Sequence, residues 1–158
     1  MERSASSRSG QPSKLLRSAV ALLARRDFSR AELRARLLRA AAPEARQAEV
    51  EQVLDTVQAR GLLSEDRFIE GFIRARRSRF GPVRLKHELL RRGVAGDQAD
   101  TAVARLAGDE FAAAQALWLK RFKAAPRDAR EWARQARFLA ARGFSHEVVR
   151  KVLGGRDP

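Results

Sequence analysis

The chain has 158 residues, of which 44% are hydrophobic, and its 33 Lys and Arg against 19 Asp and Glu give a net charge of +14. This composition excludes a wholly disordered chain, and the absence of cysteine excludes a disulfide framework and a thiolate metal site. No segment approaches the ~20 apolar residues that span a bilayer. The positive charge favours an anionic partner: nucleic acid, an acidic protein surface or an anionic membrane surface.

Residues 1–14 form a Ser-rich, basic segment that we expect to be a disordered tail. No apolar stretch follows it, so it does not have the pattern of a secretory signal. Together with the lack of cysteine, this favours a cytoplasmic protein.

Apolar residues at helical spacing follow the tail and predict three helices before residue 64. The first stripe runs from Leu15 to Leu23. Ser29 and Glu32 are spaced as a capping box, in which each side chain satisfies a free backbone N–H at the start of a second helix. The stripe from Val50 to Val57 predicts a third helix, which Gly61 ends.

The same plan continues to residue 107. Ser64 begins a helix whose first turn is acidic, as the helix dipole favours. Pro82 suits the first position of the next helix, where its missing N–H costs nothing, and Gly93 ends that helix. A stripe from Ala99 to Leu106 predicts the sixth helix.

Three further helices are predicted between residue 108 and the end of the chain. The first carries apolar residues from Phe111 to Phe122, and the second carries Trp132 and Leu139 and stops at Gly143. Ser145 caps the last one. No segment alternates with the period of a strand, so the predicted class is all-α.

An internal repeat relates these helices. At an offset of 52 residues, the aligned pairs are Phe28 with Phe80, Leu33 with Leu85, Arg34 with Lys86, Leu37 with Leu89, and Leu38 with Leu90. At an offset of 50, Arg92-Gly93-Val94 aligns with Arg142-Gly143-Phe144, although Leu85 then meets Gln135. We therefore expect three tandem three-helix repeats, at 15–63, 64–107 and 108–158, in an elongated array that could curve.

The distribution of charged residues along the chain matches the three predicted repeats. The first two helices of each repeat are basic, and the third helices of the first two repeats are acidic. The residues predicted to form a basic, partner-binding face are Arg25, Arg26, Arg30, Arg34, Arg74, Arg76, Arg77, Arg79, Arg84, Lys86, Arg91 and Arg92. For each of them the alternative is an ordinary solvated helix surface, and Arg84 could instead pair with Glu70 or Glu88.

Residue types that carry catalysis have simpler structural interpretations. His87 and His146 lie far apart in sequence, so no metal site is expected. The serines at 29, 64 and 145 stand at helix caps rather than beside a catalytic base. Trp118 and Trp132 are expected to pack in the core, with base stacking as the alternative. We predict no catalytic residue, metal or cofactor.

Five stretches together resemble the RecX family of recombinase regulators. They are ALLARRDFSRAEL at 21–33, GLLSEDRF at 61–68, FGPVRLKHEL at 80–89, RGV at 92–94 and RFLAARGF at 137–144. Each is common in helices, but their order and spacing are specific to the family. The resemblance implies a non-enzymatic, cytoplasmic protein of three-helix repeats that has no active-site residues.

The same resemblance implies a partner. Members of the family bind the filament that the RecA recombinase forms on single-stranded DNA and modulate it, with inhibition of its extension, ATPase and recombination as the expected direction. We expect a monomer whose direct binding to nucleic acid is weak. The alternative is a stand-alone helical repeat protein that binds nucleic acid without sequence preference. The residues leave open whether such a regulator caps the filament end or lies in its groove.

Overall fold

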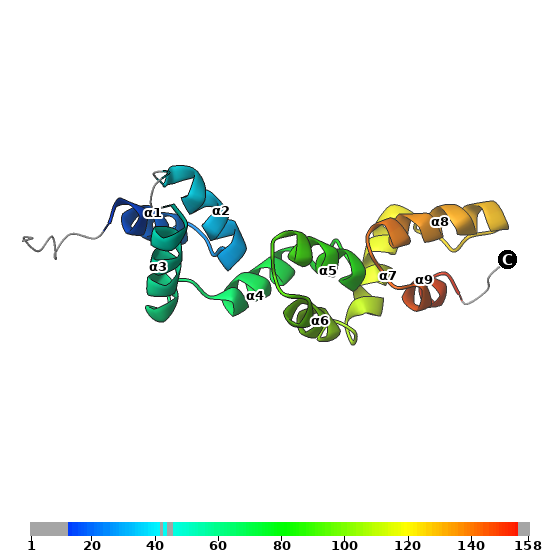
Figure 1. The fold of residues 1–158 in the computed structure, drawn as a ribbon. Helices are drawn as coiled ribbons and strands as arrows, with labels where there is room; N and C mark the ends of the chain where they lie inside the picture. Colours follow the sequence, from blue (N-terminus) through cyan, green and yellow to red (C-terminus); the bar gives the residue numbers. More distant parts are fainter. Residues whose placement is uncertain (1–12, 42, 44–45, 155–158) are drawn as a thin grey trace, which may run out of the picture. The chain divides into compact units, whose positions relative to one another are not determined.

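The computed structural model describes residues 13–41, 43 and 46–154, and throughout this part the regular structure is helical, with no strand (Figure 1). The predicted all-α class is confirmed. The chain divides into two compact units, residues 1–64 and 65–158. The predicted tail lies outside the described residues except for Ser13 and Lys14, which cap and begin the first helix.

The first unit contains α1 (Lys14–Leu23), α2 (Arg30–Ala40) and α3 (Arg46–Ala59). Ser29 caps α2, since its hydroxyl oxygen accepts a hydrogen bond from the backbone N–H of Glu32 at 3.1 Å. The apolar stripes of the three helices close over one core. Its fully buried members include Leu33, Leu37, Val50, Leu54 and Val57.

The second unit begins with α4 (Glu65–Arg76), α5 (Pro82–Arg91) and α6 (Gly96–Ala104). Pro82 occupies the first turn of α5, as predicted. These helices enclose a separate core that includes Phe68, Phe72, Leu85 and Leu89.

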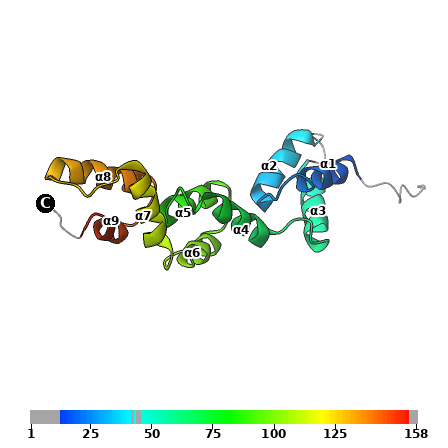
Figure 2. The same ribbon diagram turned by 180° about the vertical axis from the view of Figure 1, so that it is seen from behind.

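The second unit continues with α7 (Glu110–Arg121), α8 (Ala129–Ala141) and α9 (His146–Val152). Helix α9 packs against both α7 and α8 (Figure 2). The third core includes Trp118, Leu139, Phe144 and Val149. Each consecutive set of three helices thus has its own hydrophobic core, and we call these the first, second and third helix sets.

None of the described helices is long and apolar enough to cross a bilayer.

Candidate functional site

The predicted basic residues fall into two groups, one in each compact unit. In the first unit, Arg30 and Arg34 reach from α2 to the acidic face of α3. The Arg30 guanidinium lies 3.0 Å from a Glu51 oxygen and 2.7 Å from an Asp55 oxygen, and Arg34 Nε donates to Glu51 at 2.5 Å. The hydrogen bond from Arg34 holds the pKa of the Glu51 carboxyl below its usual value. These two cations are therefore partly neutralised within their own helix set.

Arg26 is also engaged within the first unit. Its guanidinium carbon lies 3.6 Å from the centre of the Phe28 ring, and its Nη1 lies 3.2 Å from Glu32 Oε2. Arg25 is exposed on the turn after α1.

Lys86 repeats the arrangement of Arg34 in the second helix set. It extends from α5 and forms an ion pair with Asp100 on the acidic helix α6. Arg34 and Lys86 are aligned by the 52-residue repeat, so in both sets the third helix supplies a carboxylate to the second. These ion pairs therefore explain part of the alternation of basic and acidic segments in the sequence, since basic second helices pair with acidic third helices in the first two sets.

The surface of α4 and α5 carries a continuous row of stacked side chains. Arg92 and Arg76 both lie against the Phe72 ring, with guanidinium carbons 5.1 and 4.1 Å from its centre. Arg76 continues the row to Glu88, since its Nε lies 3.7 Å from a Glu88 oxygen.

The row continues from Glu88 into the turn before α5. Arg84 Nε lies 3.2 Å from the other Glu88 oxygen, which is one of the two partners predicted for Arg84. Arg84 and Arg79 lie against the Phe80 ring at 4.0 and 5.7 Å. We call this row the Arg–Phe stack; its members in order are Arg92, Phe72, Arg76, Glu88, Arg84, Phe80 and Arg79.

The Arg–Phe stack combines the guanidinium groups of four arginines with the carboxylate of Glu88, which pairs with Arg76 and Arg84. A guanidinium that stacks on a ring keeps the N–H groups along its edge available for phosphate or carboxylate oxygens. The remaining predicted cations of this unit, Arg74, Arg77 and Arg91, are exposed around the stack on the same two helices or the turn between them. The structure thus brings a dense group of predicted site residues together on α4 and α5.

Sequence reasoning named Glu88 as a candidate partner of Arg84 but missed the two phenylalanine rings that organise this surface. A local signal was present, because an arginine follows a phenylalanine by four residues at Phe72 and at Phe80. Residues four apart lie on one face of a helix. The same spacing recurs in α8, where the Arg142 guanidinium lies 3.8 Å from the centre of the Phe138 ring.

The two tryptophans pack against the third core, as predicted. Trp118 is 8% exposed, and its indole N–H donates to Gln135. Trp132 is half-buried, and its indole N–H is buried without a hydrogen-bond partner. Among the described residues, no three His, Asp or Glu side chains are grouped as metal ligands would be.

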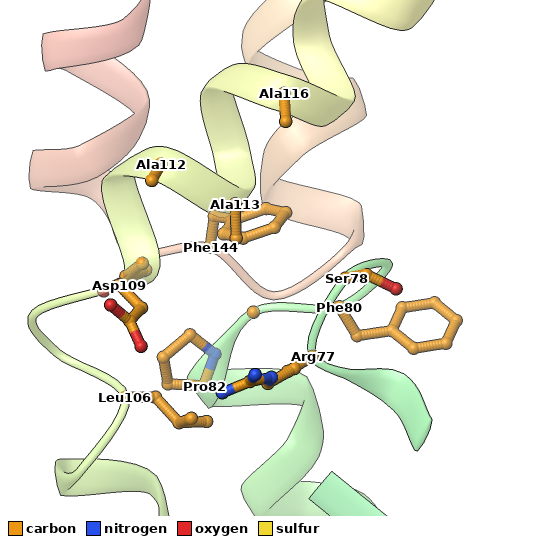
Figure 3. Close-up of a pocket in the computed structure, with 12 residues that line it drawn as sticks. Arg77, Ser78, Phe80, Pro82, Leu106, Asp109, Ala112, Ala113, Ala116 and Phe144 are labelled. Carbon is orange, nitrogen blue, oxygen red and sulfur yellow. The ribbon is translucent and has the colours of Figure 1, made fainter. Parts of the chain in front are cut away.

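A cavity of about 410 Å³ lies between the turn before α5 and helix α7 (Figure 3). Its walls include Phe80, Phe144 and three alanines of α7, with Arg77 and Asp109 as charged members. Glu110 also lines it, but its carboxylate accepts the backbone N–H of Ser145 at 2.6 Å and so joins α7 to the start of α9.

Helix sets with separate cores, joined in tandem and carrying a guanidinium-rich surface, define a helical repeat protein. Residues 64–103 match the family model for the second three-helix domain of RecX, and residues 108–153 match that for the third. The regulatory protein RecX of Leptothrix cholodnii is 48% identical over 136 residues, which cover 85% of this chain and 84% of that protein. This chain belongs to the RecX family of regulatory proteins.

Further relatives agree with this assignment. The regulatory protein RecX of Ralstonia nicotianae is 41% identical over 93% of this chain and 91% of its own length. The crystal structure of RecX from Lactobacillus salivarius superposes with a TM-score of 0.77 at 15% identity, covering 89% of this chain and 92% of that one. The latter comparison shows that the fold is shared.

Proposed function

We propose that this protein is a cytoplasmic, non-enzymatic regulator that binds the RecA filament on single-stranded DNA and inhibits its extension, ATPase and recombination activities. Membership of a family of regulatory proteins supports a binding role. The observation that carries the proposal is the Arg–Phe stack, because a nucleoprotein filament presents both the groups that guanidinium edges pair with, phosphates and carboxylates.

Stacking also prepares the arginines for binding. A free arginine side chain loses about 0.5–1.5 kcal/mol of conformational freedom when an interface orders it. Arg76 and Arg84 are already restrained by the rings and by Glu88, so less of this cost remains when a partner docks. Because arginines lie against both rings, phosphate contacts rather than base stacking should dominate, and binding should not depend on sequence.

The alternative function is a stand-alone nucleic-acid-binding protein, which the net charge of +14 also favours. The two functions differ in their dependence on RecA. A regulator should act on the preformed filament at concentrations where it binds little bare single-stranded DNA.

The test is a titration of RecA ATP hydrolysis on single-stranded DNA. We expect the wild-type protein to lower the rate at less than one copy per RecA. A variant in which Arg77, Arg79, Arg91 and Arg92 are all alanine should require much more protein for the same effect. Arg30→Gln with Arg34→Gln is the control, since those cations are paired with α3. No inhibition by the wild-type protein at a one-to-one ratio would overturn the proposal.

A further inference from the structure

Helix α5 begins without a cap of its own. Its N-cap residue is Gly81, which has no side chain to accept a hydrogen bond. The repeat aligns Gly81 with Ser29, whose hydroxyl caps α2, and in the third set Asp128 caps α8 by accepting the N–H of Glu131 at 2.8 Å. A Ser or Asp cap stabilises the start of a helix by accepting a hydrogen bond from one of its first N–H groups. The second set therefore lacks a stabilising feature that its neighbours have.

The last turn of α8 supplies the missing acceptors. The N–H of Val83, in the first turn of α5, donates to the carbonyl of Gly143 at 3.1 Å, and the N–H of Gly81 donates to the carbonyl of Arg142 at 2.7 Å. The first N–H groups and the last carbonyls of helices have no partner within their own helix. The end of α8 and the start of α5 thus satisfy each other, and their dipoles meet in the favourable orientation.

This contact is so close that it requires glycine on both sides. A Cβ on Gly81 would lie 2.5 Å from the carbonyl carbon of Gly143 and 2.6 Å from the amide nitrogen of Phe144. A Cβ on Gly143 would lie 2.9 Å from Cα of Arg84. These neighbours are backbone atoms that cannot move without moving their helices. Gly143 also has a φ of +83°, whereas Gly81 has an ordinary φ of −82°.

Arg84 connects this junction to the Arg–Phe stack. Its Nη1 lies 3.5 Å from the carbonyl of Ala141, in the same last turn of α8, while its Nε pairs with Glu88. The position of a central guanidinium of the stack is therefore set partly by the third helix set.

From this geometry we infer that Gly81 and Gly143 are positioning residues for the Arg–Phe stack. They allow the end of α8 to pack closely against the start of α5, which joins the second and third helix sets. This contact also holds Arg84 in the position from which it would bind the partner. The third set then contributes to binding through the junction. The positioning role rests on the proposed function, whereas the junction itself can be tested without RecA.

Gly81→Ala is the sharpest probe, because its backbone angles suit alanine and only the contact with Gly143 is disturbed. The absence of cysteine allows Ala104→Cys on α6 and Ala140→Cys on α8, both exposed, to carry a pair of spin labels. We expect a narrow distance distribution between the labels in the otherwise wild-type protein and a broad one with Gly81→Ala. Gly96→Ala is the matched control, since nothing lies within 4 Å of its added Cβ, and it should leave the distribution narrow.

Amide hydrogen exchange tests the junction in the unmodified protein. Amides in the first turn of a helix normally exchange fast because they lack partners. The N–H of Val83 should instead exchange slowly, because it donates to the carbonyl of Gly143 and is exposed only when the junction opens. Exchange of Val83 at the rate of a frayed helix end would overturn the junction, even if Gly81→Ala failed to fold.

The positioning role is then read from the ATPase titration. We expect Gly81→Ala to need roughly tenfold more protein than wild type for half-inhibition, a loss of about 1.4 kcal/mol. Ser29→Ala, which removes a cap in the first unit, controls for destabilisation alone and should inhibit as wild type does. Unchanged inhibition by Gly81→Ala with a broad label distribution would overturn the positioning role. Failure of the wild-type protein to inhibit would overturn it together with the proposed function, while the label and exchange results would still decide the junction.

Discussion

The indole N–H of Trp118 donates a 2.7 Å hydrogen bond to Oε1 of Gln135 inside the third core. Gln135 is only 3% exposed, and its Nε2 donates to the carbonyl of Ala124 at 3.3 Å. The internal repeat aligns Gln135 with Leu85, a fully buried leucine of the second core. The third core thus has a polar pair at the position where the second core has an apolar contact, and the second repeat comparison is weaker there for this reason.

Leucine at position 135, as at the aligned position 85, should therefore destabilise the protein. Gln135→Leu would leave the Trp118 indole N–H buried without an acceptor, at a cost of about 1–3 kcal/mol. Urea unfolding followed by circular dichroism measures this loss.

A second substitution isolates the hydrogen bond. Trp118→Phe combined with Gln135→Leu removes both partners, so the double variant should lose less stability than the sum of the single variants. Additive losses would show that the pair contributes no interaction energy beyond packing.

Glu131 should remain ionised in unusually acidic solution. The side chain of Arg127 lies 2.8 Å from one of its oxygens, and the backbone N–H of Arg127 donates to the other at 2.9 Å. The hydrogen bond from the Arg127 side chain, followed by that from its backbone, lowers the pKa of Glu131 to about 2, against an ordinary value of 4.5.

The direction of the resulting pH dependence follows from this lowered pKa. Glu131 contributes stability that is fully present above its unfolded pKa and is lost as the pH falls from about 5 towards 2. The stability difference between the wild-type protein and Glu131→Gln should be constant near neutral pH and shrink over that interval. It should be small, since the Arg127 side chain is 86% exposed. An NMR titration of the Glu131 carboxyl with a midpoint near 4.5 would contradict the expected pKa.

The paired and the stacked cations should differ in their response to salt. Each phosphate contact on single-stranded nucleic acid contributes about 0.7 to the slope of log affinity against log salt concentration. Arg79→Gln should lower that slope in an anisotropy titration with a labelled oligonucleotide. Arg34→Gln should leave it unchanged, because Arg34 is bound to Glu51. Equal effects of the two substitutions would assign binding to net charge alone.

Two adjacent leucines on α5 should differ in how much they contribute to stability. Leu89 is fully buried, so Leu89→Ala should create a cavity and cost roughly 2–5 kcal/mol. Leu90 is 40% exposed, and Leu90→Ala should change stability by no more than about 0.5 kcal/mol. Urea midpoints compare the two variants, and similar losses would place Leu90 in the core as well.

The sequence predicted the helices well because their signals are local. The stripe of α3 and the position of Pro82 in α5 depend only on residues within a few turns of each other. The basic residues of the Arg–Phe stack were predicted to share a basic face. Their arrangement around Phe72 and Glu88 was not predicted, because it depends on contact between α4 and α5. The repeat boundaries and the binding role of these residues stay predictions.

The turn at Phe80-Gly81-Pro82 also depends on a contact that is distant in sequence and therefore could not be predicted from local patterns. The sequence indicates a break between helices there, which the structure confirms. Why the break contains glycine rather than a capping serine depends on Gly143, which is 62 residues away. No pattern around Gly81 alone could have indicated that contact.

Because only the second set has glycine at the start of its second helix, only this set can accept the end of α8 from the third set. A set that carries serine at this position, as the first does at Ser29, holds a side chain where the end of another set would have to dock. A chimera with a copy of the first set in place of the second would therefore fold each core and still lack the docked end. The three sets each consist of three helices around one core, but they are not interchangeable modules.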